Sequence, residues 1–129
     1  MNVVDSSAWL AFFEGSKNAD YFAPAIEDLQ CLLVPTITLT EVFKVVARQR
    51  DAHQAAIAVA HMQQGRLVEL DESVAIRAAD CALRYHLPLA DSIVYASALA
   101  RGAIVWTQDS DFEQLPGVNF RSALPRNIQ

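Results

Sequence analysis

The chain has 129 residues, a formal net charge of -5 and 53% hydrophobic residues, so it can bury a core without disulfides or metals. The acidic balance argues against a protein that coats nucleic acid through its overall field. Cys31 and Cys81 lack the spacing of a metal knuckle or redox pair, and we expect both to be small core residues in a reducing cytoplasm. No window approaches the roughly 20 apolar residues that a membrane helix needs.

Short β-prone runs alternate with longer helical segments along the chain. Strands are expected at 2–4, 32–34, 66–70, 104–106 and a short 118–120. Helices are expected at 6–13, 19–29, 39–50, 51–64, from 72 to about 86, and 89–101. A polar tail that Pro125 keeps irregular follows. No repeat or linker interrupts this order, which predicts one domain over residues 1–129.

This alternation determines the expected fold class. Strands separated by helices of ten or more residues pair in parallel through right-handed crossovers. The sequence therefore predicts an α/β protein, a three-layer α/β/α sandwich with a central, mostly parallel sheet of four to five strands. In such sheets, ligands bind beyond the carboxyl ends of the strands, where the chain order reverses.

Four acidic residues stand at the ends of these elements: Asp5, Glu41, Asp91 and Asp109. Asp5 directly follows the first strand, and Asp109 comes three residues after the end of the fourth, so both project from one sheet edge if these strands are neighbours. Close carboxylates repel each other by up to about 4 kcal/mol per pair, a penalty that a divalent cation removes. An all-oxygen ligand set matches Mg²⁺ or Mn²⁺ rather than zinc or copper.

Each acid also has a purely structural explanation. Asp5 can cap the helix that starts after it. Glu41 stands three residues after Thr38, which is the spacing of a capping box. Asp91 falls in the first turn of its helix, where the helix dipole favours a negative charge. Asp109 can shape a turn. These separate explanations do not account for the fact that all four acids stand at the ends of helices or strands.

The motifs V-V-D-S-S-A-W, T-E-V, L-A-D-S-I-V-Y-A-S-A and T-Q-D-S-D-F follow one another along the chain. In this order, spacing and context they resemble PIN domains, and in particular the VapC toxins of type II toxin–antitoxin pairs. The resemblance covers nearly the whole chain. No single motif is specific, and the order of the four carries the similarity. It implies a metal-dependent endoribonuclease that hydrolyses RNA phosphodiester bonds.

By this resemblance, the four acids line the active site and bind one or two Mg²⁺ or Mn²⁺ ions. Asp5, Asp91 and Asp109 are expected to form the metal-binding core, and Glu41 to ligate the metal or orient the attacking water. Three further residues are expected to support these ligands: Ser7, Thr107 and Asp111. For Ser7 and Thr107, the alternative structural roles are in a helix first turn and at a strand end.

Two basic residues are candidates for binding the RNA backbone. Lys44 and Arg48 share a helix face with Glu41, at i+3 and i+7, and can offset the repulsion between an acidic pocket and RNA. The alternative is a solvated face with weak ion pairs.

The resemblance also implies a homodimer and a small antitoxin that blocks the site. Aromatic residues near the amino end can contribute to an antitoxin groove, although helical spacing assigns most of them to the core: Trp9, Phe12, Phe13, Tyr21 and Phe22.

Two other classes of function stay open at this point. The first is a catalytically silent PIN fold that acts as a binding module, against which the four intact acids argue. The second is a phosphoacceptor receiver domain, which needs an acidic pair after the first strand and a Lys after the last. The chain instead has Asp5 followed by two serines, and no Lys beyond Lys44. A phosphatase of the D-x-D type is disfavoured because Ser7 stands at the second acidic position.

Overall fold

The strands form from short apolar runs rich in β-branched residues. The computed structural model describes residues 1–123 and has five strands, β1 (Asn2–Val4), β2 (Leu32–Pro35), β3 (Arg66–Val68), β4 (Ile104–Thr107) and β5 (Val118–Phe120). All four neighbouring pairs are parallel, in the order β3-β2-β1-β4-β5. The predicted α/β class and parallel sheet are confirmed.

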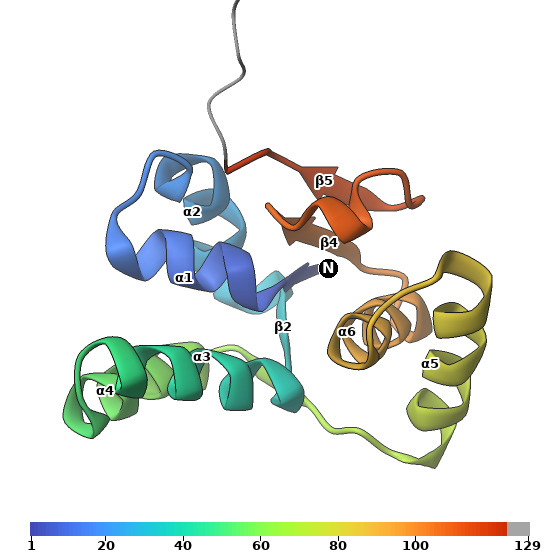
Figure 1. Cartoon of the computed structure of the whole chain (residues 1–129), viewed down its shortest axis with the longest axis horizontal. Coiled ribbons are helices and arrows are strands. Elements are labelled where there is room, and N and C mark those ends of the chain that lie inside the picture. Colours follow the sequence, from blue (N-terminus) through green and yellow to red (C-terminus); the bar gives the residue numbers. More distant parts are fainter. Residues whose placement is uncertain (124–129) are drawn as a thin grey trace, which may run out of the picture.

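Six α-helices connect the strands (Figure 1), namely α1 (Ser6–Glu14), α2 (Ala19–Glu27), α3 (Thr36–Gln49), α4 (Ala52–Met62), α5 (Glu72–Tyr85) and α6 (Leu89–Ala100). Two 3-10 turns, η1 (Leu29–Cys31) and η2 (Ser110–Phe112), complete the described part of the chain. The expected irregular tail around Pro125 lies outside the described residues.

Helix α3 begins three residues earlier than expected. Pro35 occupies its N-cap position with a φ of -60°, and the Thr38 hydroxyl inside the first turn donates to Pro35 O at 2.7 Å. Thr38 is therefore not the N-cap, and the capping-box explanation for Glu41 is wrong. Glu41 instead lies in the second turn, where it satisfies no helix terminus.

The strand order places a switch point between β1 and β4. The chain winds outward from β1 through β2 to β3, then crosses back through α5 and α6 to β4 on the other side of β1. The β1–β4 pairing continues past β1, because Asp5 N–H donates to Trp106 O at 2.9 Å. The carboxyl ends of these two strands therefore border the crevice in which doubly wound sheets bind ligands.

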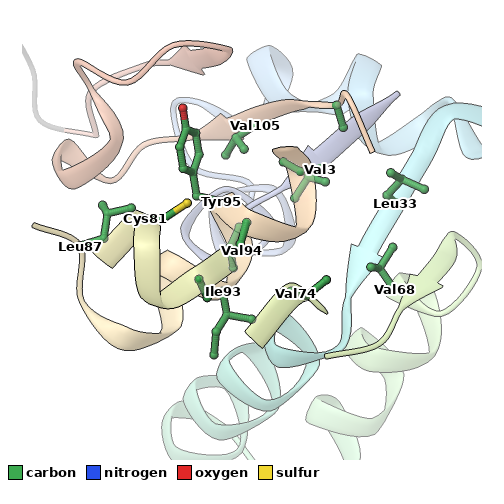
Figure 2. Close-up of a cluster of buried hydrophobic side chains, with 14 of the residues drawn as sticks. Val3, Leu33, Val68, Val74, Cys81, Leu87, Ile93, Val94, Tyr95 and Val105 are labelled. Atoms are coloured by element: carbon green, nitrogen blue, oxygen red, sulfur yellow. The ribbon is translucent and has the colours of Figure 1, made fainter. Parts of the chain in front are cut away.

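Helices cover both faces of the sheet. Alternate strand residues point to opposite faces, and Val3, Leu33 and Val105 pack with α5 and α6 in one core cluster (Figure 2). Val4, Leu32 and other buried residues pack with α1 to α4 in a second cluster. This arrangement confirms the three-layer prediction. In residues 1–123, no helix is long and apolar enough to cross a membrane.

Candidate active site

The acidic residues meet at the switch point. Asp5 follows β1 and is the N-cap of α1, Asp109 lies two residues beyond β4, and Asp91 lies in the first turn of α6. Their charges act on one another, because the pKa of Asp91 is raised first by burial and then by the charges of the other four acids of the cluster. The structure thus brings together five carboxylates from four separate parts of the chain: Asp5, Glu41, Asp91, Asp109 and Asp111. We refer to these five residues as the acid cluster.

Asp5 is the most enclosed member of the acid cluster, with 1% of its surface exposed. Its Oδ2 accepts hydrogen bonds from the hydroxyls of Ser7 (2.7 Å) and Thr107 (3.0 Å), and a longer one from Ser7 N–H (3.4 Å). Its Oδ1 is buried and has no hydrogen-bond partner among residues 1–123. Burial raises the pKa of Asp5, and the two hydroxyls offset part of that rise. A buried oxygen without a donor is costly, which indicates a site for a positively charged ligand.

Asp91 and Glu41 face Asp5 from two helices. Asp91 is 9% exposed, and desolvation followed by the charges of Asp5 and Asp109 raises its pKa to about 8. Burial, followed by the charge of Asp5, also raises the pKa of Glu41, whose Oε1 is a second buried atom without a partner in the described chain. Each carboxylate therefore disfavours ionisation of its neighbours.

Asp111, which was expected to support the ligands, belongs with Asp91 and Asp109 to the close group of carboxylates found among residues 1–123, and Asp5 and Glu41 are not part of that group. One oxygen each from Asp91, Asp109 and Asp111 lies within 4.8 Å of the others. The Asp109 side chain caps η2 by accepting Asp111 N–H at 2.9 Å, so the turn that Asp109 shapes also presents Asp111. The structural and functional explanations for Asp109 are compatible.

Three hydroxyls orient the acids. The Thr107 hydroxyl donates a hydrogen bond to Asp5 Oδ2 and accepts one from Asp109 N–H at 2.9 Å. These two hydrogen bonds link the ends of β1 and β4. The Ser7 hydroxyl bonds Asp5 and lies 3.2 Å from that of Thr107. Ser6, which the sequence analysis did not single out, hydrogen-bonds the Glu41 carboxylate and lowers its pKa. Its place beside Asp5 in the D-S-S motif is the signal that could have identified it.

The donor set fits a hard divalent cation. All members of the acid cluster offer oxygen, and no Cys or His belongs to the group of possible ligands found among residues 1–123. Mg²⁺ and Mn²⁺ prefer such ligands. The unpartnered oxygens of Asp5 and Glu41 are the atoms whose burial such a cation would compensate.

The two candidate RNA-binding residues lie on α3, which leads away from the site. Lys44 and Arg48 are both exposed, and the Lys44 charge lowers the pKa of Glu41. The one ion pair within residues 1–123 joins Asp80 and Arg84. In the described chain, neither Lys44 nor Arg48 therefore has a carboxylate within ion-pair distance.

Fold and site together define a doubly wound α/β domain with a carboxylate cluster at the switch point of a parallel sheet. The model of the PIN domain family matches residues 3–118 of the sequence. The chain therefore belongs to the PIN domain family. None of the curated proteins matches it significantly.

Solved structures with the same fold are found among toxin–antitoxin proteins. VapC20 of Mycobacterium tuberculosis, described as a toxin that cleaves the sarcin–ricin loop, is 19% identical, with a TM-score of 0.75 over 92% of this chain and 97% of that one. A toxin–antitoxin complex from Klebsiella pneumoniae gives 20% identity, a TM-score of 0.73, and coverages of 92% and 96%. DNA-bound VapBC from Salmonella typhimurium gives 15% identity, a TM-score of 0.72, and coverages of 95% and 98%.

Proposed function

We propose that this protein is an Mg²⁺- or Mn²⁺-dependent endoribonuclease, the toxin of a type II toxin–antitoxin pair, acting in the cytoplasm as a single domain over residues 1–129. The observation that carries the proposal is the buried Oδ1 of Asp5, which lacks a partner in the described chain and belongs to a cluster of carboxylates whose charges raise the pKa of Asp91. Similarity to a toxin described as cleaving the sarcin–ricin loop supports RNA as the substrate.

Asp5, Asp91 and Asp109 are the proposed core ligands, and the position of Asp111 makes it a further candidate. A bound divalent cation would lower the pKa of a water molecule and offset negative charge on the phosphate in the transition state. Glu41, whose pKa is lowered by the Ser6 hydroxyl, would accept a proton from that water or orient it. The Ser7 and Thr107 hydroxyls keep Oδ2 of Asp5 occupied, which leaves Oδ1 as the oxygen available to a cation.

Lys44 and Arg48 are the proposed contacts for the RNA backbone on the α3 side. Both are exposed, and they follow Glu41 by one and two helical turns. A positive charge beside the acidic pocket offsets its repulsion of phosphates. Replacing both by Ala is expected to raise KM for RNA and reduce its salt dependence, which steady-state kinetics would measure.

A small antitoxin is the proposed protein partner, because several similar structures are toxin–antitoxin complexes. A cavity of about 180 Å³ opens between α1, α3 and α4, with Leu10, Phe13 and Ile57 among its apolar lining residues. Of the five amino-terminal aromatics, Phe13 reaches this cavity, whereas Trp9 and Phe22 are fully buried. An apolar antitoxin side chain would fit there. Ile57→Asp should abolish co-purification with the antitoxin and preserve cleavage.

A homodimer is the proposed assembly. Helix α5 lies at the edge of the molecule (Figure 1) and exposes a stripe of Ile76 (68% exposed), Ala79 and Leu83 (81% exposed). A two-fold axis through such a stripe would place Ile76 of one copy against Leu83 of the other. Leu83→Glu is expected to yield monomers in sedimentation experiments.

The test of the nuclease proposal uses the purified full chain and total bacterial RNA. We expect cleavage with Mn²⁺ or Mg²⁺, no cleavage after addition of EDTA, and recovery when excess Mn²⁺ is restored. Cleavage that persists in EDTA would contradict the proposal. Metal-dependent RNA binding without cleavage would instead identify the catalytically silent binding module.

A further inference from the structure

One arginine outside the residues assigned above follows β5, the strand that pairs with β4. Arg121 directly follows β5, and its N–H donates to Thr107 O at 3.0 Å, which extends the pairing of Thr107 with Phe120 in β4 and β5. The Thr107 hydroxyl is itself 3.0 Å from Asp5 Oδ2. The backbone of Arg121 is therefore one strand away from the residue that orients Asp5.

A buried amide fixes the backbone around Arg121. The Asn18 side chain, on a residue that is 5% exposed, donates to Ser122 O at 2.9 Å, to Arg121 O at 3.5 Å and to Gln108 Oε1 at 3.1 Å. Gln108 directly precedes Asp109 in the chain. Asn18 thus ties the segment after β5 to the loop that carries an acid of the cluster.

The Arg121 side chain is supported by an aromatic ring. Its guanidinium carbon lies 4.3 Å from the centroid of Tyr21, whose ring is 5.5 Å from that of Trp106. Arg121 is exposed and, within residues 1–123, has no carboxylate within ion-pair distance. A guanidinium held over a ring is pre-organised and keeps N–H donors available for a phosphate.

We propose that Arg121 binds an RNA backbone phosphate next to the one that is hydrolysed, an inference that rests on the proposed function. In sheet order, β2 leads into α3 with Lys44 and β5 leads to Arg121, while β1 and β4, with Asp5 and Asp109 at their ends, lie between them. In strand order, the elements that carry the two cations therefore flank the strands that end at Asp5 and Asp109. An RNA strand that crosses this sheet edge meets a positive charge before and after the acidic pocket, which offsets the repulsion of its phosphates.

The test compares Arg121→Ala with Arg101→Ala in the full chain. Arg101 is exposed and is the C-cap of α6, just before β4. Its replacement therefore removes the same charge at the amino ends of the strands, away from the acid cluster. With Mn²⁺ and a single-stranded RNA of mixed sequence as the probe, we expect Arg121→Ala to raise KM about tenfold and to leave kcat within about twofold. The slope of log kcat/KM against log salt should become shallower by about 0.7, the value for one phosphate contact on a single strand.

A further variant separates the charge from the packing. Arg121→Lys keeps the charge and should retain the salt dependence of the wild type. Equal kinetics for Arg121→Ala and Arg101→Ala would overturn the proposal. A lower melting temperature and lower kcat with an unchanged salt slope would also overturn it, because that pattern assigns Arg121 to packing on Tyr21. A wild-type chain that cleaves no RNA would refute the proposed function itself, and the inference with it.

Discussion

Three aspartates cap α-helices in the described chain, and one of them behaves differently. Asp51 and Asp71 are exposed and accept the backbone N–H three residues ahead, at 2.7 and 2.9 Å. Asp5 accepts its N–H at 3.4 Å, is almost fully buried, and leaves Oδ1 without a partner in residues 1–123. Capping accounts fully for Asp51 and Asp71. At Asp5 it explains neither the burial nor the unpartnered oxygen, and these two features distinguish a candidate site residue from a cap.

The largest expected difference between the two kinds of cap is in catalysis. Asp5→Asn keeps the shape and an oxygen for the two hydroxyls but removes the charge, so we expect the rate of RNA cleavage to fall roughly 100-fold or more. Asp71→Asn is expected to stay within about twofold of the wild type, because Asn is an equally good N-cap. Initial rates with Mn²⁺ would measure both. Equal losses of cleavage rate in Asp5→Asn and Asp71→Asn would contradict the distinction between a site residue and a simple cap.

The second difference concerns metal binding to the folded protein. A cation present at about 100 times its dissociation constant adds roughly 2.7 kcal/mol to the free energy of unfolding, equivalent to roughly 10 °C in melting temperature. We expect Mn²⁺ to raise the melting temperature of the wild type and of Asp71→Asn by this amount. Asp5→Asn and Asp91→Asn should show little increase. A rise in all four proteins would indicate metal binding elsewhere on the chain.

The alternation of strands and helices made most of the fold predictable. Apolar runs of three or four residues and helices with clear stops specify the parallel, three-layer arrangement. The described strands lie within two residues of the predicted ranges, with β3 ending at Val68 rather than at residue 70. The start of α3 was the main error. Residues 36–38 are Thr-Ile-Thr, which is β-prone in isolation, but Pro35 supplies an N-cap geometry and the Thr38 hydroxyl satisfies its carbonyl.

The acid cluster was predictable only in part, for a physical reason. Asp5 and Asp109 follow strands, so the rule for switch points brings them together. Asn18 and Arg121 give no such signal, because their contacts join residues about a hundred positions apart and depend on the register of β5 against β4. The bond between Ser6 and Glu41 likewise depends on how α1 meets α3. Side-chain contacts of this kind follow from tertiary packing rather than from local pattern.

The third expected difference is between Asp91, a member of the acid cluster, and the simple cap Asp71. It concerns how the stability of the metal-free protein depends on pH. The pKa of Asp91 rises from an ordinary 3.8 to about 8 on folding, so the folded state binds more protons than the unfolded state between these values. Stability is therefore greatest below the lower value and falls as pH rises through the higher one, by up to about 1.4 kcal/mol per pH unit for one such group. Melting in EDTA from about pH 5 to about pH 8 would measure this fall. Asp91→Asn should flatten it, and Asp71→Asn should not.

The smallest expected effect is on the free energy of unfolding, which should change in opposite directions when the two kinds of cap are replaced. Asp71→Ala removes a bond of 2.9 Å to Val74 N–H and should lower the free energy of unfolding by about 1 kcal/mol. Asp5→Asn removes a carboxylate whose charged form is disfavoured first by burial and then by the charge of Asp109, so in EDTA at neutral pH we expect the variant to be at least as stable as the wild type. Denaturant titrations of both variants would measure the two signs. A protein that gains stability when Asp5 is neutralised retains that charge at an energetic cost, which is expected where the charge serves a ligand rather than the fold. Equal destabilisation of the two variants would show instead that Asp5, like Asp71, is principally a cap.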